Sequence, residues 1–282
     1  MKTIGFIDYF HDNWHANNYP PWIRDSAVSG WEVKYAYALQ DAPSPGLGTD
    51  AWCAKSGVQK CKSMEEIIER SDALIVLAPN NPERHEELSR LPLESGKPVY
   101  IDKTFAPDLA AAKRMFAMAE AGKTPMFSSS ALRYASELAE IKSKVPRDEL
   151  NLVAARGGGK FGIYIIHQLE MIVSLLGPGP KRVMSVGVPE APVLIIDYGK
   201  ARATATMVPG PFSIAAEHGA DQGMAFGEVK SAFFVNLIAA MLTFFQTREI
   251  PVAKEETLAV IALIDAAKKA VAERDAWVDV ER

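Results

Sequence analysis

Short apolar runs alternate with amphipathic segments along the first half of the chain. The pattern of β-branched and apolar positions predicts strands at residues 3–7, 31–39, 73–78, 98–102 and 125–130. The run at 73–78, ALIVLA, is apolar at every position, which is typical of a strand buried on both faces of a parallel sheet. The first half therefore contains the strands of a buried sheet.

Helices are predicted between these strands. Start and stop signals place them at residues 20–30, 63–72, 83–94 and 109–121, and the segment 41–50 is a loop by its Pro and Gly content. Strands that alternate with helices at short spacing favour right-handed βαβ units. We predict a doubly wound sheet over about residues 1–128, with a ligand crevice at the carboxyl ends of the strands.

The pattern changes after Ser130. A polar helix at 132–145 leads to a strand, a triple glycine at 157–159 and an apolar helix that ends at Gly177. Several β runs separated by Pro and Gly follow between 182 and 229, and two amphipathic helices follow at 232–247 and 254–273. We predict an α/β protein: a Rossmann-type doubly wound parallel sheet at 1–128, then an α+β domain with an open, mainly antiparallel sheet at 129–282.

Composition narrows the class of protein. The 282 residues suit two domains, and 48% hydrophobic with 23% charged residues is ordinary for a folded chain. A net charge of -4 provides no basic excess for nucleic acid, and no apolar stretch is long enough for a membrane span. Two cysteines, Cys53 and Cys61, do not form a disulfide or zinc signature. We expect a cytoplasmic protein without a nucleic-acid or membrane partner.

Several motifs occur in a characteristic order. They are PNNPERH at 79–85, VYIDKT at 99–104, ALRY at 131–134 and HQLEMIVSLLG at 167–177, followed by the two C-terminal helices. In this order the chain resembles the glucose-fructose oxidoreductase, inositol dehydrogenase and rhizopine-catabolism (Gfo/Idh/MocA) family. The resemblance implies a Rossmann domain that binds NAD or NADP and a second domain that covers a sugar-like substrate.

The resemblance assigns a catalytic role to Lys103, which matches the lysine of the family's Glu-Lys-Pro motif beside the nicotinamide and a substrate hydroxyl. An ammonium at the end of a buried strand can stabilise developing alkoxide charge and exchange a proton. The alternative is a solvated lysine at a strand end. The rest of the motif departs, with Asp102 for the glutamate and Thr104 for the proline.

The same comparison selects His167 and Glu170 on the apolar helix. His167 matches the family histidine that contacts the substrate, and Glu170, one helical turn later, matches an aspartate that can orient it. Ile163 and Ile165 replace the motif's first aspartate and its glycine. The alternative for His167 is a satisfied core histidine.

The loop after the first strand lacks the glycines of a dinucleotide-binding turn. Asp8, Phe10 and Asn13 stand at the three glycine positions. A carboxylate about 4 Å from a phosphate costs on the order of 1 kcal/mol in water and about 4 kcal/mol at an effective dielectric constant of 20. The loop therefore argues against ordinary pyrophosphate binding.

The resemblance nevertheless predicts which positions line the cofactor and the substrate. Asp41, after the second strand, is the candidate for the ribose contact, and His85 either faces the nicotinamide or caps its helix. The cofactor positions are Asp8, Phe10, His11, Asn13, Asp41, Pro79, Asn80, His85 and Asp102. The substrate positions are Arg133 and Tyr134.

A small acid and histidine cluster lies in the first loop. His11 and His15 are four residues apart, which on a helix puts both imidazoles on one face, and Asp8 and Asp12 lie nearby. A polar loop lining the crevice is favoured over a metal site, so no metal ligand is assigned.

Three functions remain open. The first is an NAD(P)-dependent oxidoreductase acting on a hydroxyl or carbonyl of a sugar-like or polyol-like small molecule, with Lys103 and His167 exchanging the proton. The second is a non-redox ligand-binding or regulatory protein on the same scaffold. The third is a metal-assisted lyase or hydrolase. The open sheet also predicts a homo-oligomer, a dimer or a tetramer.

Overall fold

The computed structural model describes residues 1–219 and 222–281. The contacts divide it into two compact units. The first contains Met1–Ser129 and Leu237–Ala253, and the second contains Ser130–Asn236 and the described residues from Lys254 onward. Residues 237–253, which the sequence placed with the second domain, thus pack with the first unit; otherwise the division falls close to the predicted boundary.

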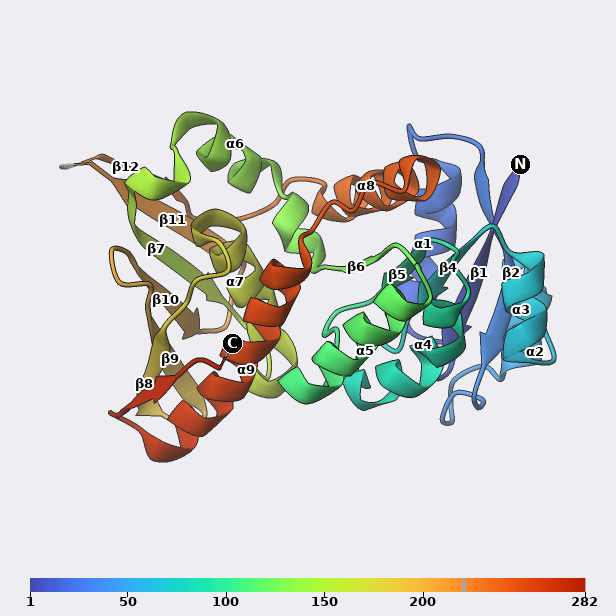
Figure 1. Cartoon of the computed structure of the whole chain (residues 1–282), viewed down its shortest axis with the longest axis horizontal. Coiled ribbons are helices and arrows are strands. Elements are labelled where there is room, and N and C mark those ends of the chain that lie inside the picture. The colour runs from blue at the N-terminus through green and yellow to red at the C-terminus, as the bar shows by residue number, and fades with distance from the viewer. Residues whose placement is uncertain (220–221, 282) are drawn as a thin grey trace. The chain divides into compact units, whose positions relative to one another are not determined.

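A six-stranded parallel sheet, counted over the described residues, forms the centre of the first unit (Figure 1). Its spatial order is β3-β2-β1-β4-β5-β6, so the direction of strand addition reverses between β1 and β4. The strands are β1 (Lys2–Asp8), β2 (Trp31–Ala38), β3 (Gln59–Lys60), β4 (Ala73–Val76), β5 (Val99–Ile101) and β6 (Met126–Ser128). All except β3 were predicted.

Helices flank this sheet on both sides. Figure 1 shows α4 and α5 side by side along one side of the strands, with α1 and α8 on the other. The bounds are α1 (Trp14–Arg24), α2 (Thr49–Ser56), α3 (Met64–Arg70), the 3-10 turn η1 (Pro82–Arg84), α4 (His85–Glu94), α5 (Leu109–Ala121) and α8 (Phe233–Thr247). The predicted helix at 109–121 has the observed bounds, and α2 was missed.

The prediction for the first helix was wrong. It placed the start at Pro20, whereas α1 begins at Trp14 and has Pro20 and Pro21 inside it. The reason is the cap: the side-chain Oδ1 of Asn13 accepts a hydrogen bond from the Ala16 N–H at 3.0 Å. This cap starts the helix before the two prolines, which then lie where their missing N–H groups leave carbonyls without helical partners.

Aromatic packing explains why α8 belongs with the first unit. The ring of Phe244 lies 5.0 Å from that of Phe127 on β6, and the ring of Phe245 lies 5.5 Å from that of Trp31 on β2. Both phenylalanines are buried. Two large side chains of this kind bury enough apolar surface to hold the helix against the first sheet.

The second unit is built on a seven-stranded mixed sheet, counted over the described residues, in the order β12-β11-β7-β10-β9-β8-β13. Strands β7 and β10 pair in parallel, and the other pairs are antiparallel. The strands are β7 (Leu150–Gly157), β8 (Arg182–Val188), β9 (Ala191–Asp197), β10 (Arg202–Met207), β11 (Ser213–His218), β12 (Gln222–Phe226) and β13 (Trp277–Asp279). The predicted α/β class and both sheet types are confirmed.

Two long helices of the second unit, α7 (Phe161–Leu176) and α9 (Lys254–Glu273), pack against this sheet, and its shorter helical segments pack against α7 (Figure 1). The shorter segments are the 3-10 turn η2 (Ala131–Tyr134), α6 (Ser136–Lys144) and the 3-10 turn η3 (Arg147–Glu149). Burial alternates along β10, as expected for a sheet covered on one face. The predicted polar helix at 132–145 is divided at Ala135, whose backbone is extended.

The structure also gives the state of the two cysteines and the length and polarity of the helices. Cys53 and Cys61 are free thiols, and both are buried. Within the part of the chain that the structure describes, every helix is too short or too polar to cross a bilayer.

Candidate active site

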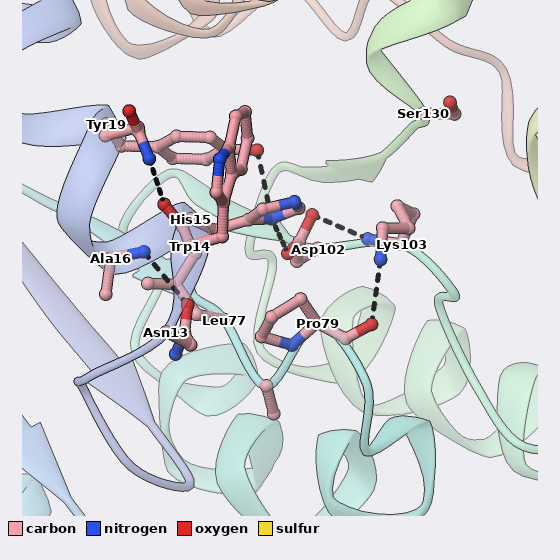
Figure 2. A network of polar contacts seen from close by, with 12 residues as sticks. Asn13, Trp14, His15, Ala16, Tyr19, Leu77, Pro79, Asp102, Lys103 and Ser130 are labelled. Atoms are coloured by element: carbon pink, nitrogen blue, oxygen red, sulfur yellow. Dashed lines mark hydrogen bonds and ion pairs between the residues drawn. The ribbon is translucent and has the colours of Figure 1, made fainter. Parts of the chain in front are cut away.

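The carboxyl ends of three adjacent strands bring polar groups together in the first unit. Strand β1 ends at Asp8, β4 leads into the loop that contains Pro79, and β5 leads into Asp102 and Lys103. This edge includes the point between β1 and β4 where the strand order reverses. Ligands of open α/β sheets bind at such a point, so this edge is the candidate site (Figure 2).

Lys103 is largely buried, with 8% of its surface exposed. Its Nζ donates a hydrogen bond to the carbonyl oxygen of Pro79 at 2.8 Å. Burial lowers the pKa of Lys103 from its ordinary value, and the charge of Asp102 opposes that shift. The Lys103–Thr104 peptide bond is cis. A lysine whose pKa is lowered toward neutrality can exchange a proton more readily than a solvated one.

Asp102 connects the lysine to a histidine from another element. Its Oδ1 accepts the backbone N–H of Lys103 at 2.8 Å, and its Oδ2 forms a short contact with Nδ1 of His15 on α1. Figure 2 shows the His15 ring and the Asp102 carboxyl pointing toward each other. Burial alone raises the pKa of Asp102, but His15 and Lys103 outweigh that effect and hold the pKa below its usual value.

His15 belongs to the candidate site, whereas the sequence suggested it only as a member of a metal cluster. Its ring stacks on Tyr19 with centroids 5.1 Å apart, and the Tyr19 hydroxyl lies 3.4 Å from its Nδ1. The sequence paired His15 with His11 as a candidate metal cluster. The partner is Asp102, 87 positions further along the chain, and no local pattern indicates a pair so distant.

Asp8 is completely buried at the end of β1. Its Oδ1 accepts hydrogen bonds from the backbone N–H groups of Tyr9 at 2.7 Å and Ala78 at 3.0 Å. Its Oδ2 accepts the side-chain amide of Asn13 at 2.8 Å. Burial raises the pKa of Asp8 to about 7, against the lowering effect of these donors. The buried carboxyl group at the end of β1 thus accepts hydrogen bonds from three N–H groups of the protein.

The residues at this edge of the sheet therefore suit the nicotinamide end and the pyrophosphate of a dinucleotide to different degrees. Lys103 fits the reactive end of the cofactor, where an ammonium can contact a substrate hydroxyl. The β1–α1 turn does not fit a phosphate in the usual way. Asp8 already accepts the Tyr9 N–H of the turn and the Ala78 N–H of the loop after β4, and Asn13 caps α1. That the turn opposes ordinary pyrophosphate binding stays a prediction.

The other loop positions have local structural contacts. The ring of His11 is buried against Trp52 with centroids 4.6 Å apart, and burial lowers the pKa of His11 to about 3. The Phe10 carbonyl accepts the Asn13 amide at 2.8 Å. Asp41 is exposed and its Oδ1 accepts the Thr49 N–H at 2.6 Å, at the start of α2.

The histidines do not form a metal cluster of the kind considered from the sequence. His11 precedes α1, so it and His15 do not share a helix face. Among the described residues, no group of three or more His, Cys, Asp or Glu side chains is arranged to hold a metal ion.

The loop after β4 contains the remaining cofactor candidates. His85 is buried at the start of α4, with Nδ1 3.0 Å from the Phe105 carbonyl oxygen and Nε2 2.5 Å from the Leu77 carbonyl oxygen. Burial lowers the pKa of His85. His85 thus links the loops after β4 and β5, while Pro79 is buried and Asn80 is exposed.

His167 lies on α7 in the second unit. Its Nδ1 is 2.7 Å from the Ser130 hydroxyl oxygen, and its half-buried ring lies 5.4 Å from that of Phe212 and 5.7 Å from that of Tyr164. A half-buried imidazole with a hydroxyl partner keeps both interpretations of His167 open, catalytic and structural.

Glu170 and Arg133 form a buried ion-pair cluster in the second unit. Arg133 Nε donates to Glu170 Oε2 at 2.6 Å, and Arg133 Nη1 contacts Glu256 Oε2 on α9. Arg147 joins the cluster, with Nη2 3.3 Å from Glu256 Oε1. The sequence expected Glu170 to orient His167 and Arg133 to bind substrate, whereas these contacts join η2, α7 and α9 to each other.

Tyr134, the other predicted substrate residue, lies next to this cluster in the sequence. Its carbonyl oxygen accepts the side-chain amide of Asn236 at 2.9 Å. The structure thus gives Tyr134 a backbone contact within the second unit, and its substrate role stays a prediction.

Comparison with known proteins gives a family match for part of the first unit. Residues 31–128 match the oxidoreductase family GFO_IDH_MocA, described as an NAD-binding Rossmann fold. The matched residues, about a third of the chain, lie in the Rossmann-type unit. This similarity agrees with the resemblance to the Gfo/Idh/MocA family that the motifs predicted.

Individual relatives are distant. An uncharacterized oxidoreductase, YhhX of Escherichia coli (strain K12), is 25% identical over 141 residues, which are 43% of this chain and 41% of that protein. The match therefore spans less than half of this curated relative.

Two solved structures share the fold over nearly the full length of both chains. The myo-inositol 2-dehydrogenase from Lactobacillus plantarum has a TM-score of 0.81 at 12% identity and is covered over 100% of both chains. GenD2 from gentamicin A biosynthesis, in complex with NAD, has a TM-score of 0.80 at 13% identity, with 100% of this chain and 97% of that chain covered.

Proposed function

We propose that this protein is an NAD(P)-dependent oxidoreductase that interconverts a hydroxyl and a carbonyl on a sugar-like or polyol-like small molecule. The observation that supports this most is Lys103, a largely buried lysine held at the end of β5 by the Pro79 carbonyl, with its pKa lowered. Its position corresponds to the motif lysine of the family. NAD or NADP, when bound, would supply the redox chemistry of such a reaction.

The chain's own contribution is proton transfer at Lys103 Nζ. When a hydroxyl carbon is oxidised, the hydroxyl proton must leave, and a neutral amine beside it accepts that proton. In the reverse direction the ammonium donates the proton to the developing alkoxide and stabilises its charge. The hydrogen bond to the Pro79 carbonyl oxygen fixes the position of Nζ. The negative charge of Asp102 raises the pKa of Lys103 and so offsets part of the lowering caused by burial.

The substrate class rests on the relatives. A structural neighbour is named a myo-inositol 2-dehydrogenase, and a polyol offers the hydroxyl that the lysine chemistry needs. His167 is the proposed second proton-exchanging residue, with Tyr134 as a proposed substrate contact. Arg133 and Glu170 act in this proposal as the supports that fix α7.

We also propose that the protein works in the cytoplasm as a homo-oligomer, a dimer or a tetramer. The sheet of the second unit has a shallow apolar hollow of about 260 Å³ over β7, β11 and β12, lined by residues that include Leu152, Ala215 and Met224. Exposed apolar sheet surface favours self-association. Size-exclusion chromatography with light scattering tests this, and a monomer at micromolar concentration contradicts it.

A second function is favoured by one observation. The buried carboxyl group of Asp8 lies where a dinucleotide's phosphates would bind. It already accepts hydrogen bonds from the N–H groups around it. This favours a non-redox ligand-binding or regulatory protein that has lost the dinucleotide.

A nucleotide titration separates the two functions. Purified protein is titrated with NAD⁺, NADH, NADP⁺ and NADPH to millimolar levels, with thermal unfolding and nucleotide fluorescence as readouts and adenosine as the control ligand. The oxidoreductase proposal expects a thermal shift with at least one dinucleotide and its reduction in the presence of a polyol panel. No response to any of the four contradicts it and supports the second function.

A further inference from the structure

The side chain of Asp8 lies where Rossmann folds usually receive an anion. Strand β1 ends at Asp8, α1 begins at Trp14, and the turn between them lies next to the loop after β4. In dinucleotide-binding folds the backbone N–H groups of this turn and the first turn of the helix face the pyrophosphate. An acidic side chain at this place is the opposite of what a phosphate site requires.

The contacts of Asp8 are those that an oxyanion makes in such a turn. One oxygen accepts two backbone N–H groups, from Tyr9 on the turn and from Ala78 after β4, and the other oxygen accepts the amide of Asn13. Asn13 in turn caps α1 through its own oxygen on Ala16 N–H. The carboxyl group is thus linked to both strands and to the helix start, and it is completely buried.

We propose that the Asp8 carboxylate is an internal substitute for a phosphate group, and that it competes with pyrophosphate-containing ligands for the β1–α1 turn. The proposal rests on the proposed function in one respect, since both place a dinucleotide at this edge of the sheet. It adds the chemical class of ligand whose binding at the turn is weakened and names the side chain that weakens it.

The ionisation of Asp8 sets the pH at which it competes with phosphate. Burial chiefly, and then the charge of the second buried carboxyl at this edge, Asp102, raise the pKa of Asp8 to about 7. Asp8 therefore repels a phosphate fully only at a pH above this value, where the binding test is made. Nδ1 of His11 is 3.9 Å from Asp8 Oδ2, but burial keeps that imidazole neutral over most of the pH range. A phosphate in this turn would therefore face carboxyl groups without a compensating cation from His11.

A purely structural role is the alternative. In that case Asp8 only ties β1 to the loop after β4, and removing its charge leaves the affinity for phosphate ligands unchanged. The two roles are separable because the first predicts a gain of binding on mutation, whereas loss of a structural contact predicts no gain.

The test measures binding of ADP-ribose and of inorganic pyrophosphate by isothermal titration calorimetry. Both probes carry the pyrophosphate and lack the nicotinamide. Inorganic pyrophosphate also lacks the adenosine and the second ribose, so it reports on the turn alone. The variants are Asp8→Asn, which removes the charge but keeps an acceptor, and Asp8→Gly, which also frees the backbone donors. The matched control is Asp12→Asn, a nearby carboxylate that accepts from Leu47 N–H at 2.8 Å.

We expect affinity for ADP-ribose to increase in the order wild type, Asp8→Asn, Asp8→Gly, with about a ten-fold gain or more for Asp8→Asn, as removal of a nearby like charge predicts. Asp12→Asn should bind as the wild type does. Equal affinity in the wild type and in folded Asp8→Asn overturns the proposal. Circular dichroism establishes folding, and Asp8→Asn alone decides if Asp8→Gly is unfolded.

The outcome is independent of the proposed function. If ADP-ribose binding is gained in the variants while the wild type shows no turnover with any dinucleotide, the competition stands and the oxidoreductase function fails. If the wild type turns over a polyol and binds ADP-ribose as tightly as both variants, the function stands and the competition fails.

Discussion

His15 on α1 is bonded through Nδ1 to the Oδ2 of Asp102, which follows β5, so that two segments 87 residues apart share one buried polar contact. The other oxygen of Asp102 accepts the backbone N–H of Lys103. The pair therefore fixes the start of the first helix relative to the strand that carries the candidate catalytic lysine. Its energetic weight follows from its burial, since neither side chain has water to replace its partner.

Replacing His15 by Gln should destabilise the protein strongly. The substitution removes the Nδ1 contact from the buried Asp102 carboxylate, and breaking a buried pair in this way costs about 3 kcal/mol or more. Urea unfolding followed by circular dichroism measures the change. The control is Glu32→Gln, which removes an exposed contact to Lys34 at 3.7 Å and should cost less than about 1 kcal/mol. Equal effects of the two substitutions would show that the buried pair contributes little.

Lys103→Met should abolish most of the activity while the protein stays folded. Loss of a general acid–base group lowers turnover by about 100-fold or more. Because burial lowers the pKa of Lys103, the wild-type rate should reach its plateau at a pH below the ordinary lysine pKa of 10.5. Steady-state kinetics from pH 6 to pH 10 with a turned-over polyol provide the measurement.

The matched control for Lys103 is Lys97→Met. Lys97 is also held by backbone carbonyls, with Nζ 2.6 Å from the Ser71 oxygen, but it lies away from the carboxyl ends of the strands. Its substitution should leave the pH profile unchanged. A Lys103→Met variant that keeps wild-type turnover contradicts the proposed role.

His167→Gln distinguishes a catalytic imidazole from a packed one. If His167 exchanges a proton with substrate, turnover falls by about 100-fold while thermal stability changes little. Ser130→Ala, which removes the hydroxyl 2.7 Å from Nδ1, should produce a smaller loss, because it affects only the orientation of the ring. Unchanged turnover in folded His167→Gln assigns the residue to packing.

The pH dependence of the free energy of unfolding should report the ionisation of Asp8. Its pKa is about 7 in the folded protein against 3.8 unfolded, so between these values the folded state binds more protons. Stability due to this group therefore decreases as the pH rises from about 4 to 7, by up to about 4 kcal/mol at 1.36 kcal/mol per pKa unit. Urea unfolding of the wild type and Asp8→Asn at pH 5 and pH 8 measures it.

His11 changes the free energy of unfolding with pH in the opposite direction, so its contribution must be distinguished from that of Asp8. Its folded pKa of about 3 lies below the ordinary 6.5, so its contribution to stability is lost as the pH falls through that range. Asp102, the other carboxyl facing Asp8, has a lowered pKa and stays ionised near neutrality. The wild-type curve minus that of Asp8→Asn should therefore retain the Asp8 slope, and a difference that is flat with pH contradicts the assignment.

The sequence by itself determined the α/β architecture, because each of its signals is local. The helix at 109–121 follows from an Ala-rich amphipathic run after a capping Asp108, whose Oδ1 accepts the Ala111 N–H at 2.8 Å. The buried strand at 73–76 follows from an uninterrupted apolar run. Lys103 was found because the order of motifs along the chain resembles that of a family.

Only the tertiary structure decided what the polar side chains do. His15 meets Asp102, and Asp8 meets Ala78, because the sheet order puts β1, β4 and β5 next to one another, and sheet order is a non-local property. Arg133 likewise pairs with Glu256, 123 positions away, and its substrate contact stays a prediction. A buried charge takes the partner that packing brings to it, and the spacing of residues along the chain does not specify that partner.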